Sequence, residues 1–184
     1  ALAKKAKYFL ASTSEVYGTA LNGGIIGEDH PLNPMSPYAG AKAGADRLVY
    51  SYWSCYDVPA VILRPFNNYG PRQHLEKMTP RFITSALKGE ALTVHGDGHA
   101  KRDWIYVIDH CEAIDRALHI PDFASIKNQV INVGTGQALS VLEIAEIILE
   151  EMGKGRDLIS YIGDRPGQVK LHRATIEKAE KLLG

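Results

Sequence analysis

Short apolar runs alternate with segments of helical periodicity along almost the whole of this 184-residue chain. Val61-Ile62-Leu63 has no polar position, which is typical of a β-strand covered on both faces of its sheet. The alternation predicts an α/β layer architecture with parallel strands. The expected strands are 7–11, 61–63, 92–95, 130–133 and 158–162, and the expected helices are 37–56, 80–88, 109–119, 141–152 and 175–183.

The composition is that of an ordinary globular protein, with 45% hydrophobic and 23% charged residues. Lys+Arg and Asp+Glu number 21 each, so no net positive field would attract nucleic acid or a membrane, and neither partner is expected. No apolar run reaches the roughly 18 residues that span a bilayer. Cys55 and Cys111 lack the spacing of a metal or redox site, so we expect both to be reduced and partly buried in a cytoplasmic protein. His95 and His99 have no third ligand at a useful spacing, and no metal is expected.

Tyr38 and Lys42 share one face of the helix that is predicted to begin after Ser36, because residues four apart lie one turn from each other. Tyrosine is a poor base at neutral pH since its ordinary pKa is about 10, and an ammonium group about 4 Å away stabilises a phenolate by about 4 kcal/mol. The pair can therefore move a proton if its face lines a dry pocket. The same spacing also occurs on exposed helices that have no catalytic role.

Thr13, Ser14 and Glu15 follow the first predicted strand. A threonine hydroxyl can bond a substrate hydroxyl, and a glutamate can act as a general base if it faces the same pocket. The alternative is an ordinary helix cap followed by a solvated charge.

Four motifs follow one another along the chain: Thr13-Ser14-Glu15-Val16-Tyr17-Gly18, Ser36-Pro37-Tyr38 with Lys42, Arg64-Pro65-Phe66-Asn67-Asn68-Tyr69-Gly70-Pro71-Arg72, and Arg102-Asp103-Trp104-Ile105-Tyr106-Val107. Together they resemble the extended short-chain dehydrogenase/reductase family, in particular its NAD-dependent nucleotide-sugar dehydratases, epimerases and decarboxylases. The resemblance implies the C-terminal part of a Rossmann-type parallel sheet with a smaller α/β sugar-nucleotide-binding domain, and a tightly held NAD or NADP. Residues 1–66 and 103–134 would belong to the cofactor domain, and 67–102 and 135–184 to the substrate domain.

By position, the resemblance implies that Tyr38 takes the proton of the sugar 4-hydroxyl while hydride leaves C4. Lys42 would support Tyr38 and the nicotinamide ribose, with Ser12 also beside the cofactor, and Thr13 would hold the 4-hydroxyl. Glu15 would remove the C5 proton, as in the 4,6-dehydratases. Loss of water from C6 and return of the hydride to C6 would then give a 4-keto-6-deoxy sugar.

Ser14 departs from the dTDP-glucose 4,6-dehydratases, which have an aspartate there to protonate the leaving 6-hydroxyl. Thr-Ser-Glu instead resembles GDP-mannose 4,6-dehydratases, some UDP-N-acetylglucosamine 4,6-dehydratases and UDP-glucuronate decarboxylases, which argues against dTDP-glucose as substrate. The leading hypothesis is a nucleotide-sugar 4,6-dehydratase in which Ser14 joins the catalytic set. A decarboxylase or 4-epimerase of the same family stays open, as does a binding module without turnover.

Five polar or cationic residues fall where the family contacts the diphosphate of its nucleotide sugar, and arginine offers a planar fork for phosphate oxygens. The alternative for each cation is a solvated surface charge. The family also suggests a homodimer formed through the helix of Tyr38. The five residues are Asn67, Arg72, Lys77, Arg102 and Arg165.

The family's Gly-x-x-Gly-x-x-Gly phosphate turn has no counterpart before the first predicted strand. Gly134-Thr135-Gly136 lacks the context and the glycine spacing of that turn. We therefore expect a fragment of a longer protein, without the N-terminal dinucleotide-binding half. Such a fragment would bind NAD poorly and turn over little on its own.

Overall fold

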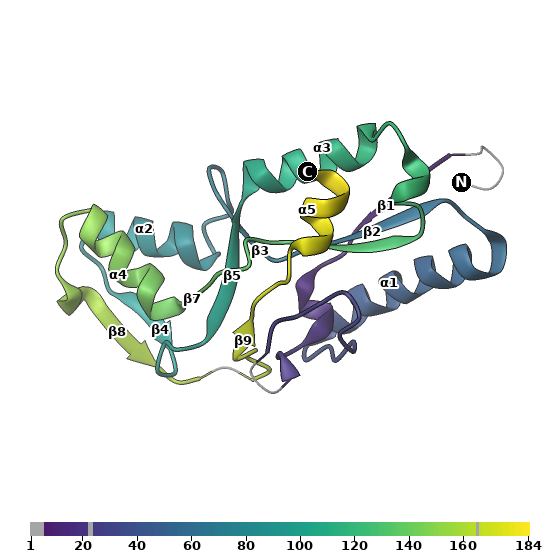
Figure 1. Cartoon of the computed structure of the whole chain (residues 1–184). Helices are drawn as coiled ribbons and strands as arrows, with labels where there is room; N and C mark the ends of the chain where they lie inside the picture. The colour runs from purple at the N-terminus through teal and green to yellow at the C-terminus, as the bar shows by residue number, and fades with distance from the viewer. Residues whose placement is uncertain (1–5, 22–23, 165) are drawn as a thin grey trace.

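Three parallel strands form the sheet of the larger lobe, on the right in Figure 1. The computed structural model describes residues 6–21, 24–164 and 166–184. Parallel pairing in this sheet, with helices on its faces, confirms the predicted α/β class. The strands lie in the order β1 (Tyr8–Ala11), β2 (Ala60–Pro65) and β6 (Gln129–Val133).

The central strand β2 is buried on both faces because α1 covers one and α3 and α5 cover the other (Figure 1). Successive side chains of a strand point to opposite faces. Ile62 accordingly packs with Trp53 of α1, whereas Val61 and Leu63 pack in the cluster that contains Ala117 of α3. This two-sided burial explains the unbroken apolar run in the sequence. The helices are α1 (Pro37–Tyr56), α3 (Val107–His119) and α5 (Glu177–Leu183).

Helix α1 begins and ends where the sequence predicts. The Oγ of Ser36 accepts a hydrogen bond from the Ala39 amide at 3.1 Å, and Pro37 occupies the first helical position, where its missing amide hydrogen costs nothing. Asp57 ends the helix in the left-handed conformation, with a φ of 50°. These ends fix the position of Tyr38 in the first turn.

The smaller lobe has a separate core between two helices and a two-stranded parallel sheet. Phe82, Leu92 and Leu149 are buried together there. Its second helix starts with a capping box, in which Ser140 and Glu143 satisfy each other's backbone amides. The elements are α2 (Met78–Lys88), β4 (Leu92–His95), α4 (Val141–Glu151) and β8 (Ile159–Ile162). Short 3₁₀ turns in the described ranges include η3 (Phe123–Ser125) in the larger lobe and η4 (Arg156–Leu158) before β8.

A mixed sheet joins the two lobes, and the sequence does not predict it. Its middle strand β5 is parallel to β3 and β9 but antiparallel to β7, unlike the purely parallel sheet of the larger lobe. The stretch from Asn67 onward, where the sequence predicts no strand, begins with one of these strands. They are β3 (Asn67–Tyr69), β5 (Lys101–Tyr106), β7 (Ala138–Ser140) and β9 (Leu171–His172).

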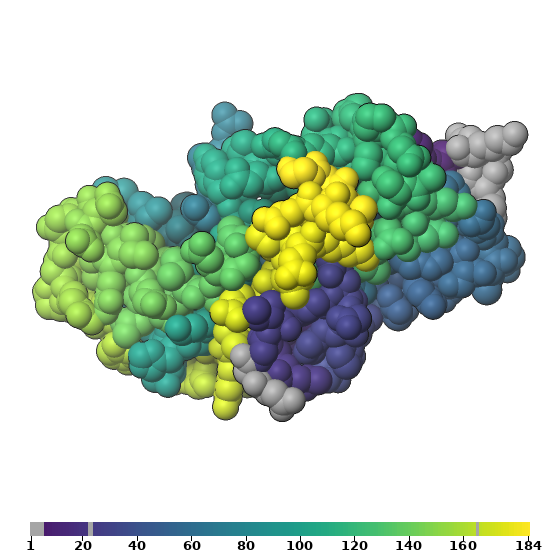
Figure 2. Space-filling model, viewed as in Figure 1, coloured from purple at the N-terminus to yellow at the C-terminus, as the bar shows by residue number. Residues whose placement is uncertain are grey.

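The C-terminal segment, yellow in Figure 2, runs across one face and lies against the purple loop that follows the 3₁₀ turn η1 (Ser14–Tyr17). Backbone bonds fix this contact: the Ile26 amide donates to the Arg173 carbonyl at 2.7 Å, and the Thr175 amide donates to the Ile26 carbonyl at 2.9 Å. Helix α5 then packs against β6 of the larger lobe. The packing therefore crosses the division expected at residue 135, and that division stays a prediction.

Cys55 and Cys111 are both exposed and form no disulfide, so the expected partial burial was wrong. Of the helices in the described ranges, none combines the length and the apolar character needed to cross a membrane.

Candidate functional site

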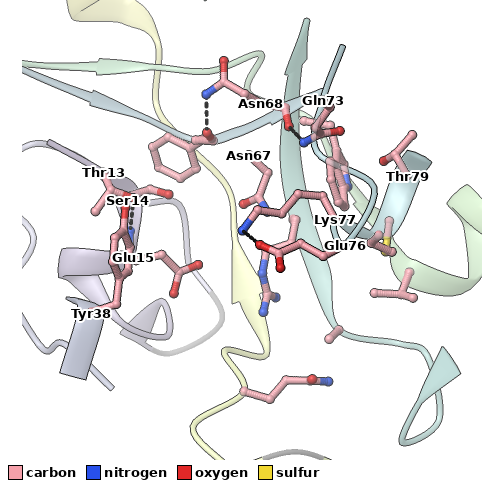
Figure 3. A pocket seen from close by; sticks show the side chains of 17 residues that line it. Thr13, Ser14, Glu15, Tyr38, Asn67, Asn68, Gln73, Glu76, Lys77 and Thr79 are labelled. Atoms are coloured by element: carbon pink, nitrogen blue, oxygen red, sulfur yellow. Dashed lines mark hydrogen bonds and ion pairs between the residues drawn. The ribbon is translucent and has the colours of Figure 1, made fainter. Parts of the chain in front are cut away.

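A pocket of about 610 Å³ lies between η1, the first turn of α1, the mixed sheet and the start of α2 (Figure 3). Polar side chains dominate the labelled part of its wall. Seven residues of the predicted site line it: Thr13, Ser14, Glu15, Tyr38, Asn67, Lys77 and Arg102.

The turn η1 directs the first three of these residues into the pocket. The Oγ1 of Thr13 caps the turn by accepting a hydrogen bond from the Glu15 amide at 3.3 Å, so the hydroxyl proton stays available to donate. Gly18 ends the turn with a φ of +69°, and a Cβ there would lie 2.1 Å from the carbonyl oxygen of Asn33. Only glycine fits this position. Ser14 is buried and still contributes to the pocket wall.

Glu15 and Tyr38 lie on the same side of the pocket, and the carboxylate of Glu15 points into it (Figure 3). The side chain of Glu15 is 33% exposed. A base and a phenol can therefore reach one ligand in the cavity.

Tyr38 and Lys42 come from successive turns of α1, as predicted. Tyr38 is 59% exposed, and within the described residues its hydroxyl makes no hydrogen bond. The Nζ of Lys42 donates to the carbonyl oxygen of Ala11 at 2.6 Å, which fixes the ammonium at the carboxyl end of β1. Ligands of open parallel sheets bind at this end of the strands.

Further polar and cationic groups line the pocket, and Lys77 lies on the side opposite Glu15 (Figure 3). Lys77 pairs with Glu76 at 3.9 Å, and both side chains are exposed. Arg102 also lines the pocket; it is 8% exposed, and its Nη1 donates to the Lys101 carbonyl at 3.0 Å. Asn67 of β3 is partly buried and lies between Thr13 and Lys77 in Figure 3. These donors suit an anionic, oxygen-rich ligand.

Four predicted site residues do not belong to the described lining of this pocket, and Lys42, which bonds the Ala11 carbonyl, is one of them. Ser12 is buried and its hydroxyl donates to Asp46 at 2.9 Å, and its contact with a cofactor stays a prediction. Arg72 is exposed, has a φ of +64° and does not line the pocket. Arg165 lies outside the described residues.

A buried polar network beneath η1 was missed from the sequence. Arg64 donates to both oxygens of Asp46 at 2.7 and 2.9 Å, and its Nη1 donates to the Tyr17 hydroxyl at 2.8 Å. That hydroxyl donates to Asn132 of β6 at 2.7 Å. A charge directly after the apolar run of β2 was the available signal, since a buried arginine requires a partner.

The electrostatics of this network favour an ion pair and a neutral phenol. Burial acts to raise the pKa of Asp46, but the hydrogen bonds and the charge of Arg64 outweigh it and hold that pKa below its ordinary value. Burial also raises the pKa of Tyr17 to about 12, against the opposing influence of Arg64. The network ties η1 to α1, β2 and β6, so it fixes the backbone that carries Glu15.

His172 is a second residue that sequence reasoning missed. It is fully buried at the end of β9, and its Nδ1 lies 3.9 Å from Oε1 of Glu15. Its Nε2 contacts the carbonyl oxygen of Gly18. Burial, with the nearby charge of Arg102, lowers the pKa of His172 to about 4, so the ring is neutral at pH 7. Nothing in the local sequence indicates this contact, because β9 and η1 are far apart along the chain.

The turn Gly134-Thr135-Gly136 has a structural role in this chain. Its backbone wraps the buried carboxylate of Asp103, which accepts hydrogen bonds from the Thr135 and Gly136 amides at 2.8 and 2.9 Å. The Asp103 carboxylate also accepts from the Ala174 amide at 3.2 Å, so it links β5, β6 and the C-terminal segment. In the described part of the chain, no three His, Cys, Asp or Glu side chains form a cluster that could hold a metal ion.

Comparisons with known proteins agree over the whole chain. The sequence model of a protein family described as GDP-mannose 4,6 dehydratase matches residues 1–184. The low-salt glycan biosynthesis protein Agl12 of Haloferax volcanii is 44% identical over 176 residues, which are 96% of this chain and 55% of that protein. The chain spans about half the length of the curated relatives it matches.

Two solved structures extend this similarity to the fold. The dTDP-glucose 4,6-dehydratase of Bacillus anthracis in complex with NAD matches with a TM-score of 0.89 at 37% identity, covering 96% of this chain and 55% of that one. The UDP-glucuronic acid 4-epimerase of Bacillus cereus in complex with UDP-glucuronic acid and NAD also has a TM-score of 0.89, at 34% identity and with the same coverages.

Proposed function

Because the chain belongs to the GDP-mannose 4,6-dehydratase family, we propose that it carries the catalytic residues of an NAD-dependent nucleotide-sugar 4,6-dehydratase. The family resemblance expected from the sequence is thereby confirmed, and so is the Rossmann-type α/β fold of its solved neighbours. One observation carries the proposal of dehydration: Glu15 and Tyr38 reach the same pocket from one side.

The first step is oxidation of the sugar at C4. Thr13 donates a hydrogen bond from its hydroxyl to the 4-oxygen. Tyr38 takes the proton of the 4-hydroxyl as the C4 hydrogen leaves with its electron pair. Lys42, fixed at the end of β1, comes from the same helix one turn after Tyr38. A ketone at C4 results.

The ketone makes the hydrogen at C5 acidic, and Glu15 is the base that removes it. The electron pair of that C–H bond forms the C5–C6 double bond as the 6-hydroxyl departs. A serine hydroxyl is a poor acid, so Ser14 orients the leaving group, and the proton held by Glu15 leaves with it as water. Hydride return to C6 and a proton to C5 then give the 4-keto-6-deoxy sugar, with no net oxidation.

The residues at the carboxyl end of β1 fit a nicotinamide ribose. Lys42 uses one ammonium proton on Ala11 and keeps two donors, and Tyr38, one helical turn earlier, has an exposed side chain. Gly40 and Gly44 have open space where a Cβ would stand, so the helix surface allows close approach. When bound, NAD accepts the hydride from C4 and later delivers it to C6.

The far side of the pocket would hold the nucleoside diphosphate. Arg102 and Lys77 supply positive charge, and Asn67 supplies an amide donor. Arg72, which does not line the pocket, has no part in this proposal. We also propose a cytoplasmic enzyme that forms a homodimer through α1.

A 4-epimerase is the second candidate, since one structural neighbour is a UDP-glucuronic acid 4-epimerase. Both reactions begin with oxidation at C4, and they diverge at Glu15. A glutamate aimed at the sugar serves proton removal from C5, which epimerisation at C4 does not need. This favours dehydration.

The test uses the protein expressed from the complete reading frame of its gene. It is incubated with GDP-mannose, dTDP-glucose, UDP-N-acetylglucosamine and UDP-glucuronate in turn, and the products are identified by mass and NMR. We expect loss of water from at least one of the first three sugars. A C4 epimer indicates the epimerase, carbon dioxide from UDP-glucuronate indicates a decarboxylase, and binding without product indicates a module that has lost catalysis.

Glu15→Gln then tests the proposed base. We expect the dehydration rate to fall about 10³-fold while oxidation at C4 continues, seen as the near-ultraviolet absorbance of reduced nicotinamide. Glu90→Gln is the matched control, because Glu90 is exposed and lies outside the pocket wall. Equal dehydration rates in both variants would remove Glu15 from the mechanism.

A further inference from the structure

His172 stands directly behind the proposed base and has one ring nitrogen that the fold does not use. The ring is completely buried and packs edge-on against Phe66, with ring centroids 5.9 Å apart. Its backbone pairs with Arg102 in the ladder between β9 and β5. These contacts fix the ring, so its two nitrogens face constant partners.

The partners of the two nitrogens define the tautomer. Nε2 lies against the carbonyl oxygen of Gly18, which can only accept, so Nε2 carries the hydrogen. The ring is neutral at pH 7, and Nδ1 is therefore an unprotonated acceptor. Nδ1 is buried without a hydrogen-bond partner in the described part of the chain. A buried acceptor in this condition costs free energy unless a donor reaches it.

The carboxyl of Glu15 approaches this acceptor, with 3.9 Å between Nδ1 and Oε1. An ionised carboxylate has only lone pairs to offer, so it cannot bond a bare nitrogen. A carboxylic acid can donate its O–H. A small rotation of the Glu15 side chain would bring a carboxyl oxygen within hydrogen-bond distance of Nδ1. Nδ1 of His172 can therefore form a hydrogen bond with Glu15 only after Glu15 has accepted a proton.

We propose that His172 is a positioning residue that accepts a hydrogen bond from Glu15 once Glu15 has taken the C5 proton, an inference that rests on the proposed dehydratase function. The abstracted proton stays bonded to a Glu15 oxygen until it leaves with the 6-hydroxyl as water, and none passes to the imidazole. The electron pair of the broken C–H bond enters the sugar, as described above. His172 thereby stabilises the product of proton removal relative to the resting carboxylate, which accelerates that step.

Two substitutions separate the two nitrogens. His172→Gln places an amide near Nε2, which preserves the bond to Gly18 and removes the acceptor at Nδ1. His172→Asn places an amide oxygen near Nδ1, which preserves the acceptor and removes the bond to Gly18. Both are made in the protein expressed from the complete reading frame.

The readouts resolve the two chemical steps with GDP-mannose, dTDP-glucose and UDP-N-acetylglucosamine as probes. C4 oxidation is followed by the absorbance of reduced nicotinamide, and C5 proton removal by deuterium entering the sugar in heavy water. For His172→Gln we expect about a tenfold slower deuterium incorporation with C4 oxidation within about twofold of the unmodified protein. His172→Asn should recover most of the lost rate.

The outcomes distinguish the two proposals. If both variants slow C4 oxidation and deuterium incorporation equally, or neither variant slows them, the role of His172 is refuted and the dehydratase stands. If the unmodified protein dehydrates none of the probes, the proposed function fails first and this inference fails with it. A measurement without variants or turnover completes the test: ¹⁵N spectra of the unmodified protein must show His172 with hydrogen on Nε2, and a hydrogen on Nδ1 would overturn the assignment.

Discussion

The two sides of the turn η1 differ in how completely their polar groups are paired. On the inner side, Tyr17 donates to Asn132 and accepts from Arg64, which also holds both oxygens of Asp46. On the pocket side, within the described residues, the carboxylate of Glu15 accepts no side-chain hydrogen bond, and the His172 Nδ1 that lies 3.9 Å from it carries no hydrogen to donate. A fully satisfied network can fix a backbone, whereas unpaired groups remain available to a ligand. The contrast indicates that the inner side of η1 holds the backbone in place, while the pocket side of the same turn presents the reactive groups.

The largest expected effect comes from the pocket side. Tyr38→Phe removes the phenolic oxygen while keeping the ring, so no group remains to take the 4-hydroxyl proton. We expect kcat to fall about 10³- to 10⁴-fold and the absorbance of reduced nicotinamide not to develop during turnover. Steady-state kinetics on the protein from the complete reading frame provide the measurement.

Tyr52→Phe is the control for this change, because Tyr52 is an exposed tyrosine of the same helix that does not line the pocket. It should leave kcat within about twofold, as is usual for an exposed substitution. A Tyr38→Phe protein that retained full activity would place proton transfer on another group.

The next effect tests the inner side. Arg64→Met keeps an unbranched side chain but removes the buried cation that pairs with the buried Asp46, and breaking such a pair costs about 3–5 kcal/mol. We expect the free energy of unfolding, measured by urea denaturation, to fall by that amount. Arg47→Met removes the other guanidinium bound to Asp46, at 3.1 Å, but Arg47 is 47% exposed, so its loss should cost less than about 1 kcal/mol. Equal losses in the two variants would show that burial does not govern the strength of this pairing.

The inner side also explains what the sequence could and could not predict. Helix α1 and the strand β2 are encoded locally, by the Ser36 cap and by an unbroken apolar run. The mixed sheet is not encoded locally, because its strands are short and rich in polar residues such as Asn67 and Arg102. Its pairing also joins segments that are distant in the sequence. Local patterns carry no information about such pairing.

The same distinction holds within the candidate site. Thr13, Glu15 and Tyr38 stand in compact motifs, and each lines the pocket as the sequence suggested. His172 reaches Glu15 only through the pairing of β9 with β5, so no spacing in the chain could indicate it. Residue type alone was insufficient for Arg72, which matched a motif but lies outside the pocket wall.

A third prediction concerns pH and His172, which contacts both sides of η1. The pKa of this histidine is about 4 in the folded protein against an ordinary value of 6.5, so as pH falls below 6.5 the unfolded chain takes up a proton that the folded chain does not. Stability is therefore lost progressively from pH 6.5 down to about pH 4, by about 3 kcal/mol in total. Urea denaturation across this range, compared with His172→Gln, isolates the contribution, since the other titrating groups are common to both proteins. Parallel pH curves for the two proteins would contradict the burial of a neutral ring.

The smallest expected effect lies on the far side of the pocket, where solvent weakens every charge. Lys77 is 61% exposed and shares its ammonium with Glu76, so its attraction for a diphosphate is screened and amounts to about 1 kcal/mol. Lys77→Ala should raise KM about fivefold and leave kcat nearly unchanged, because this group contacts the substrate equally before and during the reaction. Lys88→Ala, at the other end of α2 and outside the pocket, should change neither constant. A fall in kcat without a change in KM would instead place Lys77 with the reactive groups around Glu15. The pocket would then have no separate binding side and chemical side.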